Sequence, residues 1–185
     1  MHVFWRQGYE TTTVQDLTAA MGITAPSLYS AFGDKEGLYI EAVAYYRAQY
    51  GEHTKQILET VPDARAAIRA VLEYACFNMC DPDLPAGCMV LNSAVNCTAT
   101  SERVQDAVAT CRAEGRGWLQ ARIERGMRDG DVPAGTDCAA LASFYVTVIS
   151  GMSLQSRDGA DCQTMQAVID AAMSAWPGGN GKAAG

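Results

Sequence analysis

Apolar residues recur with the 3.6-residue period of an α-helix along almost the whole chain. Four long segments carry such stripes, at 64–79, 104–127, 137–156 and 162–176. No run of strict apolar and polar alternation exceeds a few residues, which disfavours β-strands. Breakers rich in proline and glycine separate the segments, among them Val61-Pro62-Asp63 and Asp158-Gly159. The sequence therefore predicts an all-α fold.

Residues 1–50 predict shorter helices that are joined by tight turns. Thr13 is placed to cap the first of them, with Asp16 three residues later as the partner of a capping box. Gly22 follows where the backbone must turn left-handed, and Thr24 caps the next short helix. This order of caps and breakers is typical of a helix-turn-helix that reads DNA, although an ordinary helical hairpin would share part of it.

The charge balance limits how the chain can meet nucleic acid. Its 185 residues include 14 basic and 21 acidic side chains, which give a formal charge of −7. This length suits one compact domain, or a small domain joined to a larger one. The net acidity excludes a protein that coats nucleic acid through bulk positive charge, but it leaves local recognition of DNA open.

The beginning of the chain has neither the basic nor the apolar region of a signal peptide, so we expect a cytoplasmic protein. The uncharged segment 138–156 is long enough to invite a membrane interpretation. Its serine, threonine, glycine and glutamine residues instead favour a buried helix of a soluble protein. We therefore expect no membrane partner.

Seven cysteines in a chain without an export signal predict reduced thiols. There is no C-x-x-C pair, and the only histidines are His2 and His53, so we expect no metal and no cofactor. The sequence also lacks nucleotide-binding loops, nucleophile elbows and a credible histidine base, which predicts that it is not an enzyme. One alternative is a thiol redox sensor at Cys76 and Cys80, one helical turn apart, although Glu73 would raise the pKa of a nearby thiol.

The segments 8–17, 21–32 and 34–38 together resemble the DNA-binding domain of the TetR (tetracycline repressor) family. They read GYETTTVQDL, MGITAPSLYSAF and DKEGL. Two later segments, GCMVLN at 87–92 and GMSLQSRDGA at 151–160, look like the AcrR-like subgroup of that family. The resemblance implies an all-α homodimeric repressor, whose N-terminal helix-turn-helix binds a palindromic operator. It also implies a C-terminal helical bundle that binds a small-molecule inducer and forms the dimer.

The resemblance also implies which residues contact the operator. Three would contact phosphates, and others would face base edges in the major groove. Thr24, at the helix cap, completes the predicted set. The phosphate contacts are Thr13, Tyr29 and Lys35, and the base-facing residues are Gln15, Ala25, Pro26, Ser27 and Ser30.

The chain departs from the family pattern in its first helix and in its charge. Only residues 1–7 precede Gly8, where the family normally has a full helix. Residues 1–50 carry three basic and five acidic side chains, which is unfavourable for phosphate binding. One hypothesis is that the natural chain begins further upstream or is a truncated paralogue. An alternative function is that of a dimeric ligand-binding protein that has lost DNA binding.

We expect a DNA-binding domain at 1–47, a ligand-binding and dimerisation domain at 48–177, and a disordered tail at 178–185. The last two helices each carry an apolar stripe, which favours a four-helix interface between two protomers. The predicted interface residues are Leu141, Tyr145, Val148, Ile149, Val168, Ile169 and Met173.

The methionines and aromatic residues of the C-terminal part suit an adaptable apolar cavity. For each of these residues taken alone, plain core packing is a more common role than contact with a ligand. The nearest charges are Glu73 and Arg122, so we expect a mostly hydrophobic, neutral or weakly polar ligand. The predicted cavity residues are Tyr74, Phe77, Asn78, Met89, Asn92, Trp118, Phe144 and Met152.

Overall fold

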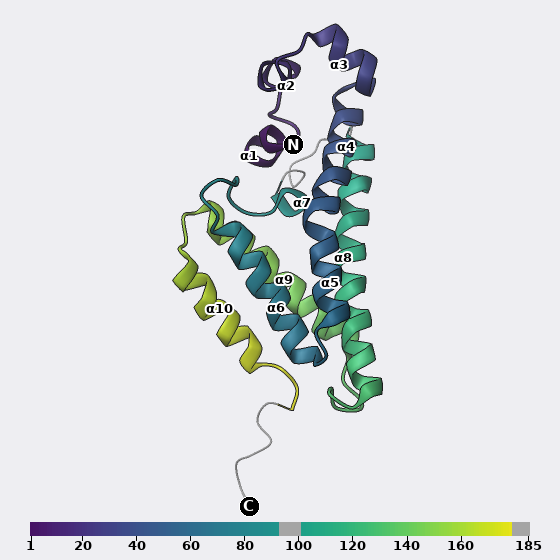
Figure 1. The fold of residues 1–185 in the computed structure, drawn as a ribbon, viewed down its shortest axis with the longest axis vertical. Helices are drawn as coiled ribbons and strands as arrows, with labels where there is room; N and C mark the ends of the chain where they lie inside the picture. Colours follow the sequence, from purple (N-terminus) through teal and green to yellow (C-terminus); the bar gives the residue numbers. More distant parts are fainter. Residues whose placement is uncertain (93–100, 179–185) are drawn as a thin grey trace, which may run out of the picture.

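The computed structural model describes residues 1–92 and 101–178 and is shown in Figure 1. Within these residues the regular structure is helical and there is no strand, which confirms the all-α prediction. Residues 179–185 of the predicted tail, and Cys97, lie outside the described residues. The elements are α1 (His2–Gln7), α2 (Val14–Met21), α3 (Ala25–Phe32), α4 (Lys35–Tyr46), the π-helical turn η1 (Arg47–Gly51), α5 (Glu52–Thr60), α6 (Ala64–Met79), α7 (Met89–Asn92), α8 (Glu102–Asp129), α9 (Cys138–Arg157) and α10 (Cys162–Ser174).

One long rod connects the N-terminal helices to the rest of the molecule. The backbone stays helical from α4 through η1 into α5, and α8 runs beside this rod in Figure 1. The predicted domain boundary at 47 therefore falls inside a continuous helix. The apolar core around Phe4, Trp5 and Tyr39 also includes Met89 and Val104 from the later part of the chain. The N-terminal helices thus share a core with the segment that follows α6.

A second core lies between α6, α8, α9 and α10. Its fully buried side chains include Ile68, Leu72 and Ile123. Three residues that we predicted at the dimer interface also belong to it: Tyr145, Ile169 and Met173 are at most 1% exposed, and the Tyr145 hydroxyl donates to the carbonyl of Ala172. These side chains face inward because α10 packs onto α6 within the same protomer. The structure thus removes them from the candidate interface.

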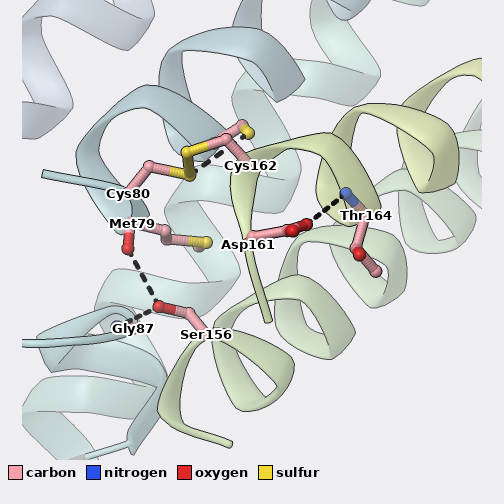
Figure 2. The surroundings of a disulfide bond; sticks show 8 residues. Met79, Cys80, Gly87, Ser156, Asp161, Cys162 and Thr164 are labelled. Atoms are coloured by element: carbon pink, nitrogen blue, oxygen red, sulfur yellow. Dashed lines mark hydrogen bonds between the residues drawn. A yellow bond between two sulfur atoms is a disulfide. The ribbon is translucent and has the colours of Figure 1, made fainter. Parts of the chain in front are cut away.

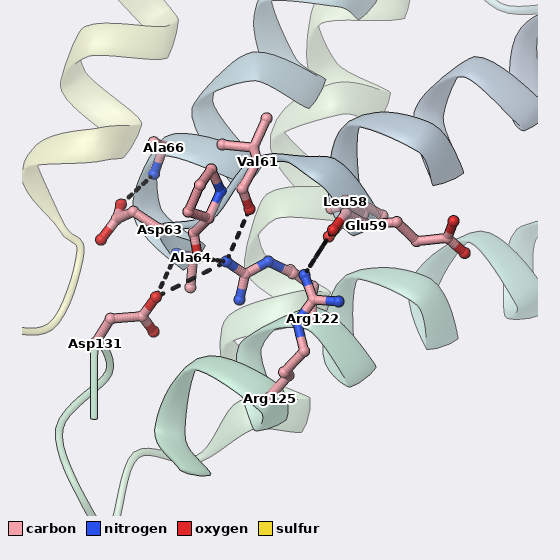
Figure 3. A network of polar contacts seen from close by, with 10 residues as sticks. Leu58, Glu59, Val61, Asp63, Ala64, Ala66, Arg122, Arg125 and Asp131 are labelled. Atoms are coloured by element: carbon pink, nitrogen blue, oxygen red, sulfur yellow. Dashed lines mark hydrogen bonds and ion pairs between the residues drawn. The ribbon is translucent and has the colours of Figure 1, made fainter. Parts of the chain in front are cut away.

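Arg122 closes the corner where the α5–α6 turn meets the end of α8 (Figure 3). The residue is 3% exposed, and its Nη2 donates to the carbonyls of Val61 and Pro62 at 3.2 and 2.6 Å. The same nitrogen lies 3.8 Å from Asp131, which in turn accepts from the backbone N–H of Ala64. Burial, and secondarily the charge of Arg125, lowers the pKa of Arg122. Arg122 is therefore a structural residue, and its charge is not available to a ligand in the bundle.

The prediction that all cysteines are reduced is wrong for one pair. A disulfide joins Cys80, just after α6, to Cys162, the first residue of α10, with a Cα–Cα distance of 5.9 Å (Figure 2). Cys76 lies next to this bond, with its Sγ 3.9 Å from that of Cys80. Sequence spacing pairs Cys76 with Cys80, but helix packing brings Cys162 closer. The bond links the two helices at the end where Ser156 also ties the chain together, by donating to Met79 and accepting from Gly87.

One described helix, α9, is long and apolar enough to cross a membrane by length and composition. It packs against α6, α8 and α10 in the bundle (Figure 1). The side of α9 that these helices leave uncovered includes Phe144 and Leu154, which are 40% and 59% exposed. The apolar character of α9 is thus divided between the protomer core and one open face.

Candidate nucleic-acid interface and ligand cavity

The α2–α3 unit has the local geometry of a helix-turn-helix. The Thr13 side chain accepts from the N–H of Asp16 at 3.1 Å, and the Asp16 carboxylate accepts from the N–H of Thr13 at 2.9 Å, so the predicted capping box is present. Gly22 ends α2 with φ 65° and ψ 30°, a left-handed conformation that glycine adopts without strain. Thr24 then caps α3 by accepting from the N–H of Ser27. The turn between the two helices contains three residues.

One side of α3 is buried against the protein, and the other side is exposed to solvent. Leu28 is fully buried, while Pro26, Ser27 and Ser30 are exposed and Ala25 is half-buried. Tyr29 is 48% exposed. On α2, the Gln15 side chain is exposed as well. The residues predicted to meet DNA by resemblance therefore lie on the accessible sides of α2 and α3, at one end of the molecule in Figure 1.

Three of the predicted contacts already form hydrogen bonds within the motif. The Thr13 hydroxyl donates to Asp16 at 2.7 Å, and the Thr24 and Ser27 hydroxyls lie 2.9 Å apart. Both threonines thus hold the helix starts, and a phosphate would compete with these bonds. Ser27 keeps an exposed hydroxyl that can donate or accept.

The Lys35 ammonium, which we predicted to contact a phosphate, also makes contacts within the protein. Its Nζ donates to the carbonyls of Tyr9 and Thr12, each at 3.0 Å, and lies 4.3 Å from the centroid of the Tyr9 ring. The side chain ties the loop before α2 to the start of α4. The phosphate contact of Lys35 stays a prediction.

The fold compensates part of the acidic charge of the N-terminal region. Arg103, from α8, lies 3.3 Å from Glu36 and 4.0 Å from Asp34 at the start of α4. The α3 segment itself contains no charged residue. Counting charges along residues 1–50 missed this arginine, because it is 67 residues away from Glu36 in the sequence.

The capping box predicts a dependence of stability on pH. Hydrogen bonds from Thr13 lower the pKa of Asp16. A carboxyl whose pKa is depressed by folding stabilises the fold above its unfolded pKa, and it loses this effect as the pH falls through the folded value. We expect Asp16→Ala to lower the urea midpoint at pH 7 and to have little effect below about pH 3. If Asp16→Ala lowered the urea midpoint equally at both pH values, the capping role of the carboxylate would be contradicted.

A second candidate site is a cavity of about 200 Å³ between η1, α6, α7, α8 and α9. Of the predicted cavity residues, Tyr74, Asn78 and Trp118 line it. Most of its wall is apolar. Further lining residues that were not predicted for the cavity include Tyr46, Tyr50, Cys88, Cys111, Arg112 and Arg116.

The other five predicted cavity residues lie elsewhere. Phe77 is 70% exposed and Phe144 40%, because both face away from the bundle. Met89 and Met152 are fully buried in the two cores. Asn92 donates to the Ser153 hydroxyl at 2.8 Å and so fixes α7 against α9.

An aromatic chain connects the cavity to the N-terminal helices. The Trp5 ring, from α1, contacts Tyr46 and Tyr50 edge-on, with centroid distances of 5.0 and 5.6 Å. The Trp5 indole N–H donates to the carbonyl of Gly87 at 3.1 Å. The hydroxyl of Tyr46 donates to Cys88 at 3.3 Å. A movement of Tyr46 or Tyr50 in the cavity wall would therefore act directly on Trp5 of α1.

The remaining predicted interface residues are divided between the cavity and the surface. Ile149 lines the cavity. Leu141, Val148 and Val168 are partly buried against the core. Among the residues that the structure describes, no group of histidine, cysteine and acidic side chains could hold a metal ion.

Known proteins resemble the chain over both of its parts. The family model described as "Bacterial regulatory proteins, tetR family" matches residues 1–42, and the one described as "Tetracyclin repressor-like, C-terminal domain" matches residues 64–172. The HTH-type transcriptional repressor ComR of Escherichia coli (strain K12) is 30% identical over 181 residues, which are 96% of this chain and 85% of ComR. A solved structure of a cysteine mutant of the TetR family transcriptional regulator CifR, complexed with 26-bp double-strand operator DNA, is 40% identical with a TM-score of 0.93 and covers 95% of this chain and 92% of CifR. The chain therefore belongs to the TetR family of transcriptional regulators.

Proposed function

We propose that this regulator is a cytoplasmic repressor that binds a palindromic operator as a homodimer and is released by a small ligand in the cavity. The open, uncharged α3 face on a doubly capped helix-turn-helix carries this proposal. The 40% identical CifR mutant was solved on operator DNA, and the 30% identical ComR is named a repressor, which supports the same mode for this chain.

The proposed dimer forms through α9 and α10. Phe144 and Leu154 are large apolar side chains that a monomer leaves in water, and partly buried Val148 lies between them on α9. An apolar stripe of this kind is typical of a four-helix interface between protomers. Light scattering on the eluted protein should give the mass of two chains at micromolar concentration. A single-chain mass would argue against the homodimer.

The proposed release depends on the contact of α1 with the cavity wall. A ligand that displaces Tyr46 or Tyr50 would also displace Trp5 and the helix-turn-helix that α1 supports. Two recognition helices must match half-sites one DNA turn apart, so a small change in their separation lowers affinity. Binding of the ligand and of DNA would then be coupled reciprocally.

Selection from randomised duplexes tests the operator proposal. We expect the bound fraction to be enriched in an inverted repeat, with half-site centres separated by about 10 bp or a multiple of it. Enrichment of a single, non-repeated site would contradict binding as a symmetric dimer. A failure to enrich any sequence would support the alternative of a ligand-binding protein that has lost DNA binding.

A thiol redox sensor remains a second candidate, favoured by the Cys80–Cys162 disulfide. Disulfides in cytoplasmic proteins are mostly regulatory or catalytic. Its formation transfers two electrons and two protons from the thiols to an oxidant such as a peroxide. Cys162 is exposed and thus accessible to reductants, whereas burial, with a contribution from Glu73, raises the pKa of Cys76.

Counting free thiols distinguishes the oxidised protein, which contains the disulfide, from the reduced protein. Under denaturing conditions we expect five titratable thiols in protein treated with peroxide and seven after reduction. Cys162→Ser should titrate six in both states. If the sensor candidate is correct, operator affinity differs between oxidised and reduced wild-type protein but not between the two preparations of Cys162→Ser. Seven thiols before and after peroxide would remove this candidate.

A further inference from the structure

The charged side chains that line the cavity are all positive. Two arginines of α8, Arg112 and Arg116, lie one helical turn apart in its wall, and no described aspartate or glutamate lines it. The sequence between Asn92 and Ser101 contains no charged residue either. The described wall of the cavity therefore combines apolar side chains with two arginines and no acidic residue.

Arg112, like Arg116, has no acidic ion-pair partner among the described residues. Its Nη1 donates to the carbonyl of Val90 at 3.2 Å, and the side chain is half-buried. By contrast, Arg47 pairs with Glu114, and Arg122 pairs with Asp131. A single carbonyl leaves most of the five N–H donors of this guanidinium without an acceptor among the described residues. Arg116 is exposed and lies where a ligand would meet solvent.

The position of the Arg112 charge is visible in its effect on two cavity thiols. Burial raises the pKa of both Cys88 and Cys111, while the charge of Arg112 acts in the opposite direction on each. These cysteines come from opposite sides of the cavity, one before α7 and one on α8.

The rest of the wall selects for a compact apolar body. Val71, Leu119 and Val146 are aliphatic, and Tyr46 and Trp118 provide aromatic surfaces. The volume of about 200 Å³ is smaller than the roughly 300 Å³ at which cavities begin to hold drug-sized ligands. A fitting ligand has one small ring or a short chain.

We infer that the cavity binds a small organic anion, namely a carboxylate on an aromatic or short aliphatic body, with the carboxylate on Arg112 and Arg116. A guanidinium matches a carboxylate with two parallel hydrogen bonds, and an apolar surrounding strengthens such a pair. This inference rests on the proposed role of the cavity as the ligand site. It replaces the neutral ligand expected from the sequence, because Arg122 lies outside the cavity and Arg112 lies within it.

Calorimetric titration of the DNA-free protein tests the inference. The probes are benzoate, phenylacetate and hexanoate, each compared with its primary amide. We expect at least one carboxylate to bind with one site per protomer and at least tenfold more tightly than its amide. Arg112→Gln should weaken that carboxylate at least tenfold and leave the amide unchanged. Arg112→Lys should weaken it less, because the charge is retained.

Arg128→Gln, on an exposed position of the same helix, is the matched control and should bind as the wild type does. Circular dichroism and the melting temperature of Arg112→Gln show whether it is folded. Binding of none of the three carboxylates, or equal binding of acid and amide, would overturn the inference. Since no DNA is present, operator binding can succeed or fail independently of this result.

Discussion

Ser27→Glu is expected to reduce operator affinity at least 100-fold while leaving the fold intact. The side chain is exposed near the start of α3, on the face that would enter the major groove. At each half-site the complex would lose a polar contact and gain a carboxylate close to phosphates. Because the dimer contacts two half-sites, both effects occur twice. A 100-fold loss requires about 1.4 kcal/mol per half-site, since 1.4 kcal/mol corresponds to tenfold, and this value lies within the range of about 1–3 kcal/mol for one lost base contact.

The same substitution should not destabilise α3. Residue 27 is the third helical position after the Thr24 cap, where glutamate completes a capping box and interacts favourably with the helix dipole. We therefore expect an unchanged or slightly raised melting temperature. The control is Gln56→Glu, which makes the same change in net charge at an exposed position of α5, a helix that lies far from α3 in Figure 1. This variant should retain operator affinity within about threefold. Wild-type affinity in Ser27→Glu would exclude α3 as the DNA-reading helix.

Arg122→Ala is expected to destabilise the protein by about 3–5 kcal/mol, the range observed when one member of a buried charged network is removed. The carbonyls of Val61 and Pro62 would lose their side-chain donor, and Asp131 would lose its cation. For a chain of this length, such a loss lowers the melting temperature by roughly 6–20 °C. Urea unfolding or calorimetry at a fixed protomer concentration measures it.

Arg128→Ala provides the comparison for this loss. Arg128 lies on the same helix but is exposed, so its removal should change stability by about 0.5 kcal/mol or less. If Arg122→Ala lost less than about 1 kcal/mol, the corner in Figure 3 would not depend on the charged network. The α5–α6 turn would then be held by apolar packing alone.

The features that could be predicted from the sequence are those that depend on neighbouring residues. The capping box of Thr13 and Asp16, the left-handed Gly22 and the cap at Thr24 all have partners within five residues, and the structure contains each of them. Helix α6 has the predicted bounds 64–79 because Asp63 caps its start and its apolar stripe ends at Met79. Local rules suffice for such elements.

The cavity could be predicted only in part, because its wall is assembled from distant helices. Tyr46 reaches it from the end of α4 and Tyr50 from the π-helical turn η1, which changes the helical register and is not marked by a proline. Arg112 lies on α8, the helix on which the sequence favoured Arg122 as the charge nearest the cavity. Which of them faces the bundle is decided by the packing of α8 against α7 and the rod.

The same reason explains the errors at the dimer helices and the cysteines. A helix with apolar residues on more than one side can cover both a core and a partner, and periodicity alone does not assign each side. Tyr145 and Ile169 therefore looked equivalent to Val148, although only Val148 is partly open. The Cys80–Cys162 pair spans 82 residues, and only the packing of α10 on α6 brings the two together.

The most direct measurement is fluorescence polarisation of the protein with labelled duplexes that tile the DNA beside its own gene, at two salt concentrations. We predict that one duplex binds far more tightly than the others and keeps this preference at both salt concentrations, while its absolute affinity falls as salt increases. Uniform binding that disappears with added salt, or no binding at either concentration, would contradict the assignment of this chain as a sequence-specific DNA-binding regulator.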